Sequence, residues 1–207
     1  ESNPPVVSSR TFLVPGGVEL YGGFAGTETA LSQRNVAAHP TSLSGNVGLP
    51  GTAVDNSYHV VTITPDADPV LLDGLTIRAG YADGVDDDAI AAGLFASNTD
   101  VTLHNVVLRD HFSTNASAAA VFRNGSNTLL DRVRVLDSRS GIRLQDGEHV
   151  VTRSHFQNCY DGIGLYVANG ASWVVEHTTF AGNGGASGAL RLNGDLGGSV
   201  RDSTFID

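Results

Sequence analysis

The segment LDRVRV, residues 130–135, decides the fold, because five other segments of the chain repeat its pattern. They are LDGLTI at 72–77, LHNVVL at 103–108, VTRSHF at 151–156, VEHTTF at 175–180 and VRDSTF at 200–205. Between their last residues the steps along the chain are 31, 27, 21, 24 and 25 residues. Self-similarity at a period of roughly 20 to 50 residues indicates a solenoid or a related repeat architecture.

The columns of this alignment separate buried positions from exposed ones. The first column is always Leu or Val, and the positions between the apolar columns are mostly polar, so we interpret each segment as one strand with one buried face. The middle column changes from aliphatic to hydroxyl residues: Leu75, Val106, Val133, Ser154, Thr178 and Ser203. The last column should form one vertical stack inside the molecule: Ile77, Leu108, Val135, Phe156, Phe180 and Phe205.

A second strand and two kinds of corner recur between these segments. We expect the second strand at 140–144, 161–165 and 187–192. It ends in turn pairs: Asn124-Gly125, Asp146-Gly147, Asn169-Gly170 and Asn193-Gly194. Asp110, Asp137 and Asn158 follow the repeated segments by two residues, and Asn183 comes one position late. Asn and Asp tolerate the left-handed backbone of tight corners.

These features predict an all-β parallel β-helix with about 21 to 31 residues per coil, in preference to an irregular β-sandwich. Residues 1–207 should form a single β-helix domain, with irregular coils over 1–64, a loop excursion over 25–57 and regular coils over 65–207. One short helix is expected near 29–34. We expect the sequence to be part of a longer chain, or its last coil to be covered by another subunit.

Composition restricts the functional classes. The net charge is −10 and every basic residue is a scattered arginine, which argues against a nucleic-acid partner. No apolar run is long enough to span a membrane, and the first residues lack the pattern of a signal peptide. The single cysteine, Cys159, is expected to be a buried, unreactive thiol.

The glycine-rich stretch VPGGVELYGGFAGTETALSQRN, residues 14–35, resembles a phosphate-binding loop only in its glycines. A P-loop requires Gly-Lys-Ser/Thr, and the chain has no lysine. We interpret Pro15-Gly16-Gly17 as a corner before a short strand, and Gly22, Gly23 and Gly26 as the bend into the excursion.

The run FLVPGGVELYGGFAGTETALSQRN, followed by PTSLSGNV, DNSYHVVTI and PVLLDGLTIRAG, resembles a group of bacterial surface proteins. These are the right-handed parallel β-helix repeat proteins of the choice-of-anchor Q type, which are distantly similar to chlamydial polymorphic outer membrane proteins. The resemblance covers about residues 11 to 80 and is general afterwards. It implies a right-handed, extracellular or cell-surface solenoid without demonstrated enzymatic activity, and it brings no catalytic residues.

Carboxylates at outward positions raise the alternative of a polysaccharide lyase or glycoside hydrolase. Two acids about 5 to 9.5 Å apart could hydrolyse a glycosidic bond, and the candidates are Asp73, Asp131, Glu176 and Asp202. However, His104 separates Asp73 from Asp131 in the alignment, and Thr152 separates Asp131 from Glu176. We therefore assign no catalytic residue and no cofactor apart from a candidate metal ion.

The acidic loop at 83–88 is the candidate metal site. Asp83, Asp86, Asp87 and Asp88 carry the hard oxygen ligands that Ca²⁺ prefers, although their spacing matches no known calcium motif. A solvated corner loop is the simpler interpretation. The seven histidines are scattered, and no two have metal-ligand spacing within one strand.

Three aromatic residues are candidates for glycan binding. Trp173, Tyr166 and Tyr160 lie outside the inward phenylalanine column and could stack on sugar rings if they are exposed. The sequence nevertheless favours a non-catalytic structural or adhesive β-helix outside the cell, with carbohydrate binding or polysaccharide cleavage as alternatives. Its expected partners are other protein subunits or the rest of its own chain at the solenoid ends, and surface glycans.

Overall fold

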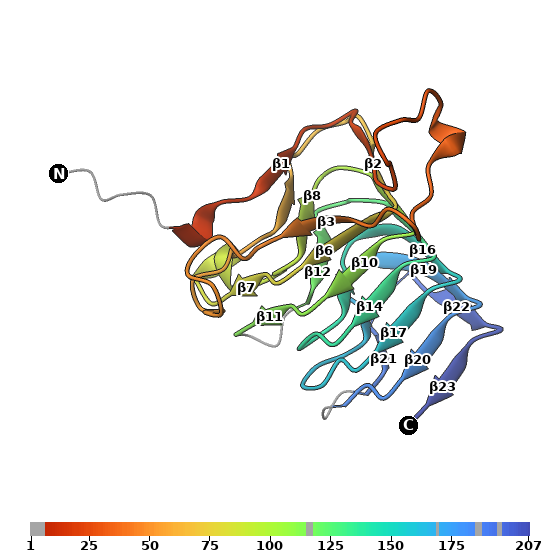
Figure 1. Cartoon of the computed structure of the whole chain (residues 1–207). Helices are drawn as coiled ribbons and strands as arrows, with labels where there is room; N and C mark the ends of the chain where they lie inside the picture. Colours follow the sequence, from red (N-terminus) through yellow and green to blue (C-terminus); the bar gives the residue numbers. More distant parts are fainter. Residues whose placement is uncertain (1–6, 115–117, 169, 185–187, 194–195) are drawn as a thin grey trace.

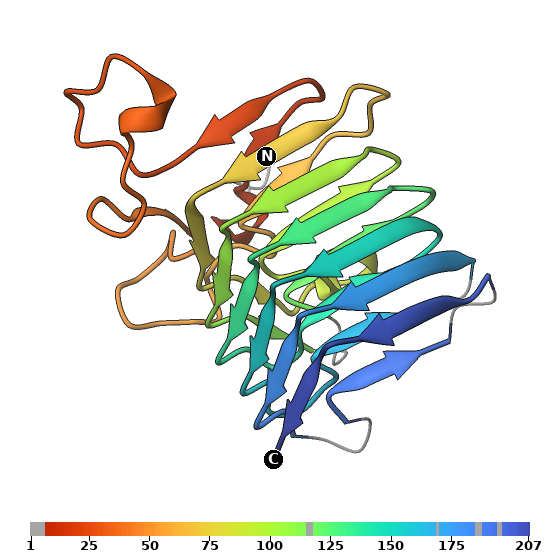
Figure 2. The same cartoon turned by 90° about the vertical axis from the view of Figure 1, so that its right-hand side faces the viewer.

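The computed structural model describes residues 7–114, 118–168, 170–184, 188–193 and 196–207. The chain winds through successive coils, and the strands of each coil stack in parallel on those of the coil before (Figures 1 and 2). Three seven-stranded parallel sheets form the walls of the solenoid. Phe122, Phe156 and Phe180 are among the largest fully buried side chains of the core inside these walls.

We number the three sheets by the order in which the chain enters them. Sheet 1 contains β1 (Phe12–Val14), β4 (Val61–Ile63), β8 (Leu94–Ser97), β12 (Ala120–Arg123), β15 (Ile142–Leu144), β18 (Leu165–Val167) and β21 (Leu190–Leu192). Sheet 2 contains β2 (Glu19–Tyr21), β5 (Val70–Asp73), β9 (Val101–His104), β13 (Thr128–Asp131), β16 (Gly147–Thr152), β19 (Ala171–Glu176) and β22 (Gly198–Arg201).

Sheet 3 and a short additional pair complete the strands. Sheet 3 contains β3 (Thr41–Ser44), β6 (Leu75–Arg78), β10 (Val107–Arg109), β14 (Arg134–Leu136), β17 (His155–Gln157), β20 (Thr179–Ala181) and β23 (Thr204–Ile206). The additional pair is β7 (Tyr81–Ala82) with β11 (Phe112–Ser113). The described residues also form three short 3₁₀ helices: η1 (Val7–Ser9), η2 (Leu31–Gln33) and η3 (Asp86–Ala89).

The predicted internal column is confirmed at every step. The Cα register pairs Ile77 with Leu108, Leu108 with Val135, and so on through Phe156 and Phe180 to Phe205. Leu43 extends the column by one coil before Ile77. The first column of the alignment is also in register, from Leu72 to Val200.

Each repeated segment spans two strands, which corrects the interpretation as one strand. The third residue of each segment has a positive φ and turns the chain sharply from sheet 2 into sheet 3. These corner residues are Gly74, Asn105, Arg132, Arg153, His177 and Asp202. The bend explains why the apolar columns stand at the first, fourth and sixth positions, a spacing that a single strand with alternating faces could not produce.

The other corners follow the predicted turn chemistry where the structure describes them. Asn124-Gly125 and Asp146-Gly147 have positive φ at both residues and connect sheet 1 to sheet 2. Asp110, Asp137 and Asn158 have φ values of 58°, 49° and 56° after the strands of sheet 3. Gly182 (φ 56°) takes the corner position in the next coil, which is why Asn183 comes one residue late. Asn169 and Gly194 lie outside the described residues.

Several boundaries differ from the prediction. The strands expected at 140–144 and 187–192 begin at Ile142 and Leu190, and Ser187 lies outside the described residues. The expected strand at 161–165 begins only at Leu165, because Gly162 and Gly164 form the corner that precedes β18. The excursion expected over 25–57 is interrupted by β3, which pairs with β6 and belongs to sheet 3. The short helix expected near 29–34 is one turn, η2, and the Gln33 side chain accepts hydrogen bonds from the Thr29 and Ala30 amides.

Candidate functional site

A row of polar side chains runs along the corner between sheet 2 and sheet 3, at the last strand residues before the corner. Asp73, His104 and Asp131 are the last residues of β5, β9 and β13, and the strand register places them on consecutive coils. We call these three residues the corner row. Asp73 and Asp131 are only 4% and 7% exposed, so these acids are less open to solvent than the sequence pattern indicated.

Close polar contacts connect the corner row from coil to coil. His104 Nδ1 lies 3.2 Å from an Asp73 carboxylate oxygen, and His104 Nε2 lies 3.3 Å from Asp131 Oδ2. The Asp73 carboxylate also accepts from the Arg34 guanidinium. Arg153 Nε donates to Asp131 Oδ1 at 2.7 Å from the following coil. Arg132 Nη1 lies 2.9 Å from His104 Nε2 and donates to Asp131 Oδ2 at 3.1 Å, so polar contacts link the corner row from coil to coil along the solenoid axis.

These contacts keep both aspartates ionised. Burial alone would raise the pKa of Asp73, but hydrogen bonds from Arg34, His104 and Asn105 outweigh it and lower this pKa below its usual value. The hydrogen bond from Arg153 lowers the pKa of Asp131 against the opposing effect of burial. A general acid must hold a proton near neutral pH. Neither aspartate does, and His104 fills the space between them that a substrate would need.

The remaining candidate acids lie further along the same side. Glu176 ends β19 and accepts from Arg201 Nε at 3.0 Å, so it too is paired between neighbouring coils. Asp202 is an exposed corner residue whose carboxylate lies 3.9 Å from His177 Nε2. Thr152 separates Asp131 from Glu176 in the register, as the alignment predicted.

The acidic loop does not gather its carboxylates around one point. Asp87 Oδ2 accepts from an Arg123 nitrogen at 2.5 Å, and Asp88 Oδ1 lies 3.6 Å from His59 Nε2. Asp86 belongs to η3 and has a φ of 52°. Among the described residues no group of three or more acidic, histidine or cysteine side chains is placed to hold a metal ion. Calcium binding by Asp83, Asp86, Asp87 and Asp88 stays a prediction.

The three aromatic candidates lie on different sides of the solenoid. Trp173 shares an inward column with the buried His149 and packs against the core, so it is not placed as an external platform. Tyr160 is 57% exposed, in the segment between β17 and β18. Tyr166 is on the outer face of sheet 1, with the guanidinium carbons of Arg143 and Arg191 at 5.4 and 5.3 Å from its ring centroid. The sequence reveals no shared surface for these residues, and the structure brings none of them together.

Two buried histidines were not singled out by the sequence. His111 accepts from the Gly80 amide through Nδ1 at 3.1 Å, and its Nε2 lies 3.0 Å from the Ile77 carbonyl oxygen. Burial lowers the pKa of His111 to about 4, so the ring is neutral at physiological pH. His149 is similarly buried beside Thr128. Cys159 is buried as predicted, and burial raises its thiol pKa to about 12.

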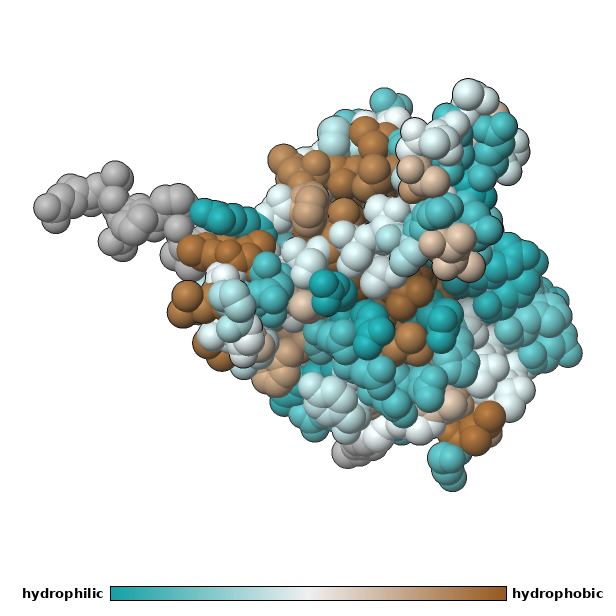
Figure 3. Space-filling model, viewed as in Figure 1, coloured by the Kyte–Doolittle hydropathy of each residue, from teal (hydrophilic) through white to brown (hydrophobic). Residues whose placement is uncertain are grey.

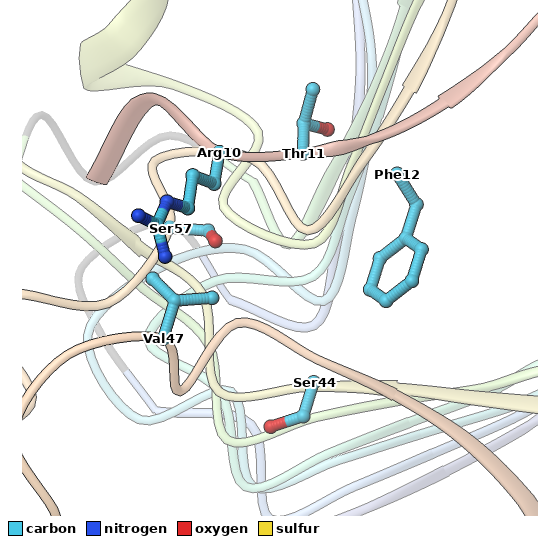
Figure 4. A pocket seen from close by; sticks show the side chains of 6 residues that line it. All are labelled: Arg10, Thr11, Phe12, Ser44, Val47 and Ser57. Atoms are coloured by element: carbon cyan, nitrogen blue, oxygen red, sulfur yellow. The ribbon is translucent and has the colours of Figure 1, made fainter. Parts of the chain in front are cut away.

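A small cavity lies between β1 and β3 in the first coil (Figure 4). Its volume is about 140 Å³, and its lining residues are Arg10, Thr11, Phe12, Ser44, Val47 and Ser57. This lining contains no carboxylate, histidine or cysteine, so it offers no pair of groups for acid–base or nucleophilic chemistry.

The sequence comparison agrees with this architecture. The family model for the right-handed β-helix region matches residues 70–205, and the chain belongs to this family. The predicted fold class, an all-β right-handed parallel β-helix, is confirmed. No curated protein and no solved structure matches the chain. None of the described helices is long and apolar enough to cross a membrane.

Proposed function

We propose that this chain is a non-catalytic structural or adhesive β-helix, located outside the cell or at its surface. The observation that carries the proposal is the pairing of the corner row: its acids are ionised, nearly buried and bound to side chains of neighbouring coils. Acids in this state stabilise the stacking of coils and are poorly suited to proton transfer. The choice-of-anchor Q resemblance supports the same role and location.

The end faces are proposed as contact surfaces. Phe12 is 48% exposed although its register partner Val61 is buried, and Phe205 is 52% exposed although Phe180 is buried. Apolar surface gathers over β1 in the first coil (Figure 3). Exposed apolar patches of this kind are typical of protein contact sites. We propose that further protein, from another subunit or from the same chain, packs there.

An assay for cleavage tests the absence of catalysis. The purified protein would be incubated with polygalacturonate and with neutral glycans, with and without Ca²⁺, and released products would be measured. We expect no products. Robust cleavage that is lost in Asp131→Asn would refute the proposal and would instead identify the corner row as an active site.

The structural role of the corner row is tested by stability. Asp131→Asn removes the charge that Arg153 and His104 contact, and we expect the unfolding free energy to fall by about 1–3 kcal/mol. Glu148→Gln is the matched control, because Glu148 is an exposed acid of β16 in the same sheet. We expect it to change the unfolding free energy by less than about 0.5 kcal/mol. Equal effects of the two variants in urea unfolding would contradict the structural role.

A further inference from the structure

The outer face of sheet 1 carries an arginine–tyrosine–arginine row in its last three coils. Arg143 of β15 is in register with Tyr166 of β18, which is in register with Arg191 of β21. Because β18 lies between the other two strands, the guanidinium groups approach the tyrosine ring from opposite sides. On the preceding coil, Val121 occupies this column and is only 1% exposed, so the row begins at Arg143.

Both arginines lack a carboxylate partner among the described residues. Arg139 and Arg153, by contrast, bind Asp161 and Asp131 of neighbouring coils at 2.7 Å. These two cations share one row on a chain whose net charge is −10. The pair therefore forms a local positive site on an acidic molecule.

The stacking fixes the arginines in place. Contact with an aromatic ring orients a planar guanidinium and reduces the freedom that it loses on binding a ligand. The Tyr166 hydroxyl oxygen lies 3.4 Å from Asn193 Nδ2 as an acceptor, so its own hydrogen can still be donated. The row thus offers two guanidinium forks with a hydroxyl between them, over two strand spacings of about 4.8 Å each.

This geometry indicates which ligand the row can bind. The faces of the Tyr166 ring are covered by guanidinium groups, so a sugar ring cannot stack on them in the way that an exposed tyrosine would allow. A guanidinium fork instead binds a planar carboxylate through two parallel hydrogen bonds. The row is one side chain wide, whereas a stable protein interface buries about 800 Å² on each partner. A linear chain with repeated charges fits such a row better.

We propose that Arg143, Tyr166 and Arg191 bind a linear, carboxylate-bearing polysaccharide that runs along the solenoid axis. Each guanidinium binds one carboxylate of the chain, and the Tyr166 hydroxyl donates to an oxygen of the sugar between them. Double-stranded nucleic acid is a poorer fit, because it is bound through many phosphate contacts and this row supplies two cations. The site requires no catalysis and is separate from the corner row.

The test is isothermal titration with polygalacturonate at low salt, with amylose as the uncharged polymer. We expect binding of polygalacturonate only, with an affinity that falls as salt is added. Arg143→Gln and Arg191→Gln should each weaken binding about tenfold or more, because each removes a charge-assisted fork. Arg143→Lys should also weaken it, since an ammonium retains the charge without the fork.

Arg134→Gln is the matched control, because Arg134 is an exposed arginine on sheet 3, away from the row. It should leave the affinity within about twofold, and circular dichroism should show that every variant is folded. No binding of polygalacturonate, equal binding of amylose, or an equal effect of Arg134→Gln would overturn the proposal. Tighter binding of dextran sulfate, polyglutamate or DNA would overturn the assignment of carboxylated polysaccharide. Cleavage of the polymer would contradict the proposed function without affecting this site.

Discussion

Gly141 occupies the corner that leads into β15 and lies against the backbone of the next coil. A Cβ atom built on Gly141 would lie 1.6 Å from the carbonyl oxygen of Gly164 in the next coil. The obstacle is backbone, which cannot move without disturbing the hydrogen bond from the Ile142 amide to the same oxygen. We therefore expect Gly141→Ala to lower the unfolding free energy by about 2 kcal/mol or more.

Gly184→Ala is the control for this prediction. The nearest atom to a Cβ on Gly184 is the Tyr160 carbonyl oxygen at 3.1 Å, which a small shift can accommodate. Urea unfolding of the two variants compares a position blocked by backbone with one where a small shift makes room for the methyl group. Similar midpoints for both would mean that the coils can separate at Gly141 at little cost.

At single corners, residue type predicted some conformations and missed others. Asp110, Asp137 and Asn158 belong to the residue types that accept left-handed backbone, and they were predicted as corners. Arg132, Arg153 and His177 adopt the same conformation without belonging to these types. The stacking of Gly74 and Asn105 above them imposes the bend, so tertiary packing overrides local preference there.

At the scale of the strands, the phenylalanine stack on sheet 3 is the largest aromatic feature of the core. Phe156 and Phe180 have ring centroids 5.0 Å apart with an interplanar angle of 11°, and Phe180 and Phe205 are 4.9 Å apart at 6°. Phe180 is fully buried between the other two rings. We expect Phe180→Ala to cost about 3–5 kcal/mol of unfolding free energy.

Phe205→Ala provides the comparison, because this ring is 52% exposed in the last coil. It should cost less than half as much as Phe180→Ala, since less apolar area is lost from the buried state. Chemical denaturation followed by near-ultraviolet circular dichroism measures both. An equal loss for the two variants would indicate that burial does not determine the contribution of a ring in this stack.

The strands on sheets 2 and 3 were predictable because their apolar residues recur in aligned columns. The strands of sheet 1 were harder to place. With glycines on both sides of Ile163, residues 161–165 resembled the neighbouring strand segments, so β18 was expected several residues before its start at Leu165. That shift concealed the row of Arg143, Tyr166 and Arg191. These residues are more than 20 positions apart in sequence and become neighbours only through the strand register. Arg34 was missed as a partner of Asp73 because it lies outside the repeated strands, at the end of η2 and 39 residues from Asp73 in sequence.

At the scale of the whole molecule, buried histidines and paired aspartates together determine the response to acid. The pKa of His111 falls from 6.5 to about 4 on folding, so the unfolded chain binds a proton there before the folded protein does. The stabilising contribution of neutral His111 is complete above pH 6.5 and is lost as the pH falls towards 4, to a total of about 3 kcal/mol. Burial also lowers the pKa of His149, so His149 adds to the loss of folding stability as the pH falls.

At still lower pH, protonation of the paired aspartates determines the further loss of stability. The lowered pKa values of Asp73 and Asp131 mean that their contribution is present above their unfolded pKa near 3.8 and disappears as the pH falls further. We expect His111→Gln, whose amide can replace the acceptor and the donor of the ring, to flatten the decline between pH 6.5 and 4. The check is urea unfolding across this pH range. An unchanged slope in His111→Gln would exclude His111 as the main cause.

The constant strand register makes each coil a unit of length. Inserting a copy of the 21-residue coil that leads from Val135 to Phe156 would move all later coils by about 4.8 Å along the axis and leave each sheet facing the same way. Placed after Phe156, with the Arg143 of the copy replaced by Gln, such a coil would increase the separation of the original Arg143 from Arg191 from two strand spacings to three. The number of coils between two side chains, more than the surrounding sequence, therefore sets the spacing of charges that a bound polymer would have to match.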